Sequence, residues 1–226
     1  MFLGHYGIAF AARRAAPHTS LGTTMFAAQF LDELWPILLL AGVEQVRIVP
    51  GLMAASALDF VSYPISHSLL IAAGWALLIG ALYFAMRRYG RGALVLSAAV
   101  LSHWLLDAPM HRPDLPLWPA SRVLVGGGLW NSVAATVAIE CAFFAAGLAW
   151  YLRGTRARDR IGRWGLWVMV AVLALIFVAG LTAAPPTDAR AVAFGALTLW
   201  LFVPWGAWVD RHREPAVRAP KGSIAR

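Results

Sequence analysis

Histidine and aspartate residues occur in this chain at positions and spacings that suit a metal site. His103 and Asp107 are four residues apart, so both side chains lie on one face of a helix. His67 lies between two serines shortly after a proline, and His5 and Asp32 precede it in mostly apolar sequence. Histidine and carboxylate ligands without cysteine suit a divalent metal such as zinc, manganese or iron. We therefore predict that His67, His103 and Asp107 are metal ligands, with His5 or Asp32 as a fourth.

A catalytic role would follow from such a metal. A catalytic site has about three protein ligands and an open position for water, whose pKa the metal lowers to about 7. Arg112 follows the helix that carries His103 and Asp107, and its planar guanidinium matches phosphate or carboxylate. We assign catalytic roles to His67, His103, Asp107 and Arg112, and we expect a lipid-like ester or phosphoester as substrate.

Composition identifies the kind of fold that must position these residues. Of the 226 residues, 60% are hydrophobic and 13% are charged, and the mean hydropathy is +0.67. A soluble domain has about half apolar and about a quarter charged residues, and a chain of this size cannot bury such an excess in one core. The net charge of +8 comes from short clusters between apolar runs, which indicates membrane orientation and not nucleic-acid binding.

The apolar runs predict an all-α, multi-pass transmembrane bundle of about six membrane helices. Besides the five clearest apolar runs named below, a sixth run, Leu21–Val43, is apolar but carries Asp32 and Glu33. The stretch Gly4–Ala12 is long enough only for an N-terminal half-helix. Residues 1–210 then form one integral membrane domain, and residues 211–226 form a basic tail that we expect to be disordered. The five clearest runs are Pro64–Met86, Gly92–Met110, Leu129–Leu152, Trp164–Ala184 and Arg190–Val209.

Basic clusters predict the orientation of these helices. Arginines gather at residues 87–91, at residues 153–163 and in the tail from residue 211, and placing all three clusters in the cytoplasm satisfies the positive-inside rule. The C-terminus is then cytoplasmic. His67, His103 and Asp107 fall in the opposite half of the membrane, so the site opens to the non-cytoplasmic side.

Several polar residues also have structural interpretations. His103 and Asp107 could form a hydrogen bond that joins two helices, because polar pairs stabilise membrane bundles. We expect Glu140, in the middle of an apolar run, to be a hydrogen-bonded carboxylate between helices, and Asp59 and Asp114 to be solvated in loops. The single cysteine excludes an internal disulfide and a cysteine metal cluster.

The order of the candidate ligands resembles a known family. An early histidine, His5, is followed by Asp32, by the stretch Ile-Ser-His-Ser-Leu around His67, and by His-Trp-Leu-Leu-Asp from His103 to Asp107. In this order the chain, over residues 1–119, resembles the membrane-bound metal-dependent hydrolases of the bacterial inner membrane, whose best-known members are DNA-damage-regulated. The resemblance implies inner-membrane localisation, hydrolase activity and a metal held by these five residues.

The chain departs from this family at two elements. Ser62 stands where the family has the first histidine of its His-Arg-Gly-x-Thr-His-Ser element. The family's Pro-Asp-x-Asp element corresponds here to Leu31-Asp32-Glu33-Leu34. Because two potential ligands are altered or absent, we expect one divalent metal, such as zinc or manganese, and not two.

Two other functions use the same polar residues. A small permease or transporter could bind an ion, a proton or a substrate with them, since intramembrane histidines and carboxylates serve such relays. The chain shows no inverted repeat, but formation of a homo-oligomer would compensate for its small number of helices. His67 and His103 could also be the two axial ligands of a haem. The expected partners are thus the lipid bilayer, a lipid-like substrate and a second copy of the chain.

Overall fold

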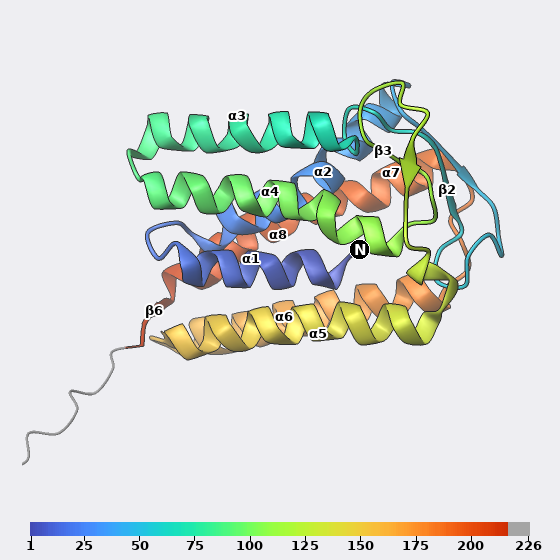
Figure 1. The fold of residues 1–226 in the computed structure, drawn as a ribbon. Coiled ribbons are helices and arrows are strands. Elements are labelled where there is room, and N and C mark those ends of the chain that lie inside the picture. Colours follow the sequence, from blue (N-terminus) through green and yellow to red (C-terminus); the bar gives the residue numbers. More distant parts are fainter. Residues whose placement is uncertain (217–226) are drawn as a thin grey trace, which may run out of the picture.

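The computed structural model describes residues 1–216 and shows a bundle of helices with short antiparallel strand pairs at both ends (Figure 1). The helices are α1 (Leu3–Ala15), α2 (Leu21–Leu40), α3 (Leu69–Arg87), α4 (Gly90–Met110), α5 (Val133–Gly154), α6 (Arg160–Thr182), α7 (Ala189–Leu197) and α8 (Phe202–Arg211). The strand pairs are β1 (Gln45–Ile48) with β2 (Leu58–Ser62), β3 (Leu115–Pro116) with β4 (Leu124–Val125), and β5 (Thr155–Ala157) with β6 (Arg213–Pro215). A 3-10 helix, Thr198–Leu201, joins α7 to α8, and another covers Leu129–Asn131.

The helices confirm the prediction of a multi-pass membrane bundle. Within residues 1–216, five spans are long and apolar enough to cross a bilayer, namely α3, α4, α5, α6 and the continuous stretch Ala189–Arg211. Large apolar side chains on their outer faces are exposed, such as Leu77, Leu175 and Leu201. Such a surface is stable only where lipid covers it. The α2 helix has 20 residues but carries Asp32 and Glu33.

The half-helix predicted at the N-terminus is α1, which lies in the middle of the bundle. Its 13 residues rise about 20 Å, which is less than the hydrocarbon thickness. It crosses α5 with the two backbones in contact, because a Cβ added to Gly147 would lie 1.9 Å from the carbonyl oxygen of Gly7. Small residues allow such close packing of membrane helices. This position brings His5 into the interior.

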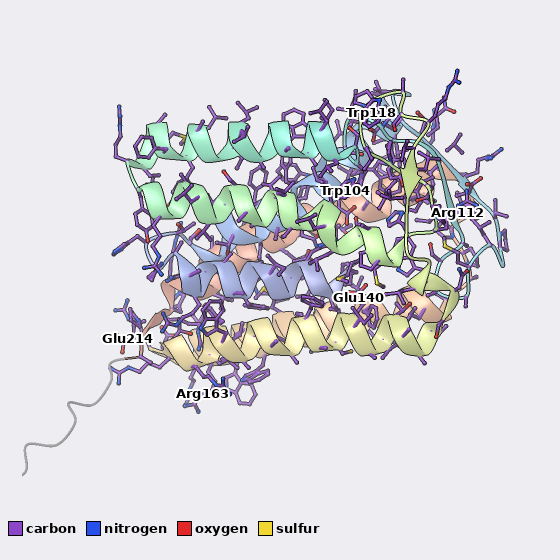
Figure 2. All side chains as sticks on the ribbon, in the orientation of Figure 1. Trp104, Arg112, Trp118, Glu140, Arg163 and Glu214 are labelled. Carbon is purple, nitrogen blue, oxygen red and sulfur yellow. The ribbon has the colours of Figure 1, made fainter. Side chains whose placement is uncertain are left out.

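The two ends of the bundle differ. We call the end covered by β1–β4 the strand end, and the end with β5 and β6 the basic end, because it carries the arginine clusters predicted to be cytoplasmic. Figure 2 shows Arg112 and Trp118 at the strand end, and Arg163 and Glu214 at the basic end. The chain enters and leaves the strand end three times between α1 and α8, so that loops from distant parts of the sequence meet there (Figure 1).

Two boundaries differ from the sequence expectation. Residues 64–68 were predicted to begin a helix, but α3 begins at Leu69, since the Glu44 carboxylate accepts the backbone N–H groups of Ile65 and Ser66 and holds a turn. His67 therefore lies in this turn, before the helix. In the tail predicted to be disordered, residues 213–215 form β6, paired with β5; residues 217–226 lie outside the described part of the chain.

Candidate metal centre

Six titratable side chains converge inside the strand half of the bundle. They are His5 on α1, Asp32 on α2, His67 before α3, His103 and Asp107 on α4, and His111 directly after α4. Two groups of three that share His103 each bring their ligand atoms within 4.8 Å of one another. The structure thus brings together all five residues predicted as ligands and adds His111. All except Asp32 are almost completely buried.

Two histidines and two aspartates form a closed ring of ligand atoms. The Nε2 atom of His67 lies 3.5 Å from Oδ1 of Asp32 and 3.7 Å from Oδ2 of Asp107. The Nε2 atom of His103 lies 3.6 Å and 3.4 Å from the same two oxygens. Ligands at zinc distances of 2.0–2.2 Å in a tetrahedron are separated by about 3.3–3.6 Å. The four measured separations are therefore close to the edge lengths of a tetrahedral coordination shell.

Hydrogen bonds to the outward Nδ1 atoms of the His67 and His103 imidazoles determine which ring nitrogen carries the proton. Nδ1 of His103 donates to the carbonyl oxygen of Ala28 at 2.8 Å. Nδ1 of His67 lies 2.7 Å from Oγ of Ser66, and that hydroxyl donates to the Glu44 carboxylate at 2.6 Å. Since a carbonyl and a committed hydroxyl can only accept, both Nδ1 atoms carry the proton. In a neutral ring the inward Nε2 atom then holds a free lone pair, as a metal ligand requires.

The His111 imidazole is oriented in the same way, with the Asp114 carboxylate as the acceptor of its Nδ1 proton. Its Nδ1 atom donates to Oδ1 of Asp114 at 3.0 Å, and its Nε2 atom faces Oδ2 of Asp107 at 3.9 Å. Burial lowers the pKa of the His111 imidazole, which favours the neutral ring. Burial and the charge of Asp114 raise the pKa of the Tyr63 hydroxyl, which stays protonated and donates to Asp114 at 2.9 Å.

The second oxygen of Asp107 faces the start of α1. Its Oδ1 atom lies 2.5 Å from the amino nitrogen of Met1 and 3.1 Å from Nε2 of His5. The His5 ring stacks on that of His103, with the centroids 3.7 Å apart. Glu140 on α5 accepts the backbone N–H groups of Phe2 and Gly4, in the space between α5 and the start of α1 that Figure 2 shows.

Glu140 therefore has the structural role expected of it, that of a hydrogen-bonded carboxylate between helices. A carboxylate at a helix N-terminus satisfies free N–H groups and interacts favourably with the helix dipole. Trp104 on α4 has a comparable role, since its Nε1 atom donates to the carbonyl oxygen of His67 at 2.8 Å. These two contacts hold α1 and the turn before α3 against the rest of the site.

A cavity of about 290 Å³ lies against the cluster. Asp32, His67, Asp107 and His111 form its polar side. Glu140 and Thr136 of α5 also line it, and the remaining lining is mostly apolar and comes largely from the segment between β1 and β2, from α6 and from α7. A small molecule in this cavity would contact both the metal ligands and an apolar wall.

Arg112, which was predicted to hold a substrate anion, does not line this cavity. Its guanidinium pairs with Asp59 and, at 3.2 Å, with Asp114, and it lines a separate surface cavity with Arg47. The expectation that Asp59 and Asp114 are solvated is wrong, since both are buried and paired with arginine. The loop after α4 folds back over β2, which brings these charges together.

His111 is the functional candidate that sequence reasoning missed. Its signal was spacing, because His103, Asp107 and His111 continue one helical face in steps of four. The predicted run Gly92–Met110 stops just before His111, and Pro109 disturbs its last turn, so the sequence assigns His111 to the outer loop. The structure continues α4 to Met110, so the next residue still follows the same face. Glu44 had no comparable signal, since its contact with Ser66 depends on the fold.

The geometry excludes a haem between His67 and His103. Axial ligands bind the iron from opposite faces of a porphyrin. Here the ring centroids are 5.5 Å apart at an angle of 70°, and both Nε2 atoms face the same carboxylate oxygens. The two rings are thus arranged around a point and leave no space for a macrocycle.

Comparison with known proteins gives one match. A family model described as YdjM inner membrane protein matches residues 2–184. The match extends from the start of α1 to just beyond α6, and therefore includes all six residues of the cluster. No curated protein and no solved structure matches the chain.

Proposed function

The chain belongs to the YdjM inner membrane protein family, and from this starting point we propose that it is a metal-dependent hydrolase of the bacterial inner membrane. Its metal site is the ring of His67, His103, Asp32 and Asp107, with His5 and His111 beside it. Its substrate is a lipid-like ester or phosphoester. Zinc and manganese are the divalent metals that suit this set of nitrogen and oxygen donors.

The separation of the inward atoms carries this proposal. If His67 and His103 were imidazolium ions bonded to the two aspartates, the N–H to carboxylate distances would be about 2.7–2.9 Å. The observed distances are 3.4–3.7 Å, and the buried Nε2 atom of His103 has no hydrogen-bond partner among the described residues. Lone pairs of nitrogen and carboxylate oxygen that face each other at such distances repel one another, and a cation between them would remove this repulsion.

The remaining residues have roles that fit hydrolysis. A divalent metal, when bound, polarises an ester or phosphoester and activates water. His111 presents its Nε2 lone pair to the same cavity and can accept the proton that water loses. The water oxygen then bonds to the carbonyl carbon or phosphorus, the ester C–O or P–O bond breaks, and the leaving oxygen takes up that proton.

Metal content of the purified protein tests the proposal directly. We expect about one zinc or manganese ion per chain after purification in mild detergent without chelator, and loss of this metal in His103→Ala and Asp107→Asn. Ser102→Ala is the matched control, because its hydroxyl bonds only the carbonyl oxygen of Ala99 and the metal should remain. Wild-type protein that takes up neither ion at micromolar concentration would contradict the metal site.

Hydrolysis separates an enzyme from a metal-binding transporter. The substrates are a fluorogenic long-chain ester and bis-p-nitrophenyl phosphate, each given to metal-loaded, chelated and His103→Ala protein. Turnover of either substrate only by the metal-loaded protein supports the hydrolase. Metal-loaded protein that cleaves neither substrate, but transports the ion into proteoliposomes, would replace the hydrolase with the transporter.

We also propose that the cavity opens to the non-cytoplasmic side. The arginine clusters lie at the opposite end of the bundle, and the positive-inside rule places that end in the cytoplasm. A fluorescent protein fused after residue 226 should therefore fold and fluoresce in the cytoplasm. A fused alkaline phosphatase that is active at this position would reverse the orientation.

A further inference from the structure

The cavity beside the metal cluster continues toward the surface of the bundle. A second cavity, of about 510 Å³, lies where the loop between β1 and β2 meets the ends of α6 and α7. The two cavities share six lining residues, namely Ala55, Ser56, Leu58, Gly180, Leu181 and Ala196. Their sizes are within the usual range for ligand pockets. The two cavities therefore adjoin, and together they extend from the candidate metal ligands toward the outer face of the molecule.

Small residues keep this path open between α6 and α7. A Cβ atom added to Gly180 or to Gly195 would meet no atom within 4 Å. The two helices pack mainly against other neighbours, α6 against α8 and α7 against α2. The part of α6 that faces the cavity is apolar and partly exposed at Ile176 and Phe177. The path is therefore accessible from the hydrocarbon region, where α6 lies.

The depth of the cluster matches that of a lipid ester. Asp107 lies three residues before the end of α4, which is about 5 Å along the helix axis. If α4 ends where the hydrocarbon ends, this is the level at which acyl chains join the headgroup. A lipid whose chain lay between α6 and α7 would thus bring its ester or phosphoester bond next to Asp107 and His111.

We propose that the joined cavities bind an acyl chain of a membrane phospholipid, which enters sideways from the bilayer through the gap between α6 and α7. The substrate class is then an acylated lipid and not a soluble ester. The substrate class rests on the proposed hydrolase function. Lipid entry rests on the cavities alone.

Photocrosslinking tests lipid entry without any need for catalysis. The full-length protein is placed in nanodiscs that contain phosphatidylglycerol with a diazirine in its acyl chain, and adducts are located by mass spectrometry. Trp35, Phe60 and Leu199 line the inner cavity and are 5%, 9% and 9% exposed, so lipid around the bundle cannot reach them. We expect adducts at these residues as well as on the outer face of α3.

Blocking variants make the test specific. Gly180→Trp and Ala196→Trp should fill the gap and reduce adducts at the three buried residues at least tenfold, while adducts on α3 stay unchanged. Gly74→Trp is the matched control, because Gly74 is an exposed glycine of α3 that also has open space around it. If Gly180→Trp were poorly folded, Gly180→Leu would provide a milder block at the same position.

Two outcomes would overturn the inference: adducts confined to exposed residues, or buried adducts that persist in both blocking variants. Metal content measured on the same samples separates this inference from the proposed function. Bound metal without buried adducts would leave the hydrolase in place and remove lipid entry. Buried adducts in a protein that binds no metal would support lipid entry and contradict the hydrolase.

Discussion

Asp107, which is buried, and Asp210, which is partly buried, lie at opposite ends of the bundle and have opposite kinds of surroundings. At the basic end, Asp210 accepts hydrogen bonds from Nε of Arg13 at 2.8 Å and 3.0 Å, from the Tyr151 hydroxyl at 3.0 Å, and from the backbone N–H of Leu21 at 3.2 Å. Among the described residues, each hydrogen-bond partner of the Asp210 carboxylate is a donor. At the strand end, Oδ2 of Asp107 faces three imidazole nitrogens at 3.4–3.9 Å, and each of these rings donates its proton elsewhere.

This difference distinguishes a structural cluster from the proposed binding site. A buried polar network in which every acceptor has a donor stabilises the fold and needs nothing further. Acceptors that face other acceptors destabilise the fold until a cation joins them. Burial alone would rank Asp210 and Asp107 together, whereas the direction of the hydrogen bonds distinguishes them.

The largest effect on stability should come from the satisfied cluster. Asp210→Ala leaves the partly buried Arg13 guanidinium without its carboxylate, and removal of one partner of a fully buried pair, the upper limit for this variant, costs about 3–5 kcal/mol. We expect this loss in the free energy of unfolding, measured by denaturant titration in detergent, with metal affinity unchanged within twofold. If Asp210→Ala instead lost metal and kept its stability, the two clusters would not differ as we describe.

The converse variant is His103→Ala. The His103 imidazole supplies one ligand of the proposed site, and it donates one hydrogen bond to the carbonyl oxygen of Ala28. We expect metal affinity to fall more than a hundredfold, about 2.7 kcal/mol, while the metal-free variant unfolds within about 1 kcal/mol of metal-free wild type. Isothermal titration with zinc and denaturant titration of chelated protein give the two values. A large loss of stability without metal would make His103 a helix bridge.

Sequence predicted the spans and most of the cluster, since both depend on local patterns. Apolar runs of membrane length define α3 to α6 without knowledge of their neighbours. The pair His103 and Asp107 follows from helical spacing. His5 and Asp32 were assigned from their order along the chain, and the structure places them beside that pair.

The rest could not be predicted because it depends on contacts between distant segments. The turn that holds His67 depends on Glu44, and the loop that holds His111 depends on a run of glycines. The N–H of Gly128 bonds the carbonyl oxygen of His111, and a Cβ on Gly126 would lie 2.0 Å from the carbonyl oxygen of Arg112. Neither contact leaves a periodic signal in the sequence.

A smaller effect should come from the residues that orient the ligands. Ser66→Ala removes the acceptor of the His67 Nδ1 proton and interrupts the connection to Glu44. Loss of such a supporting contact typically lowers metal affinity about ten- to a hundredfold. Ser68→Ala is the matched control, because this hydroxyl bonds only the carbonyl oxygen of Pro64. Equal zinc affinities in the two variants would show that the Ser66 contact does not tune the site.

The smallest effect should come from Asp159, an exposed and fully satisfied carboxylate at the basic end. The N–H of Gly162 and the imidazole of His212 hold the pKa of Asp159 below its ordinary value of 3.8. A lowered pKa adds stability above pH 3.8, which is lost as pH falls through the folded-state pKa. Asp159→Asn keeps the helix cap and removes the charge. We therefore expect its Tm at pH 6 to lie below that of wild type by less than about 4 °C, and the two to converge at lower pH. If the Tm difference between Asp159→Asn and wild type increased as the pH fell, the Asp159 carboxylate would not be stabilised by hydrogen-bond donors as that of Asp210 is.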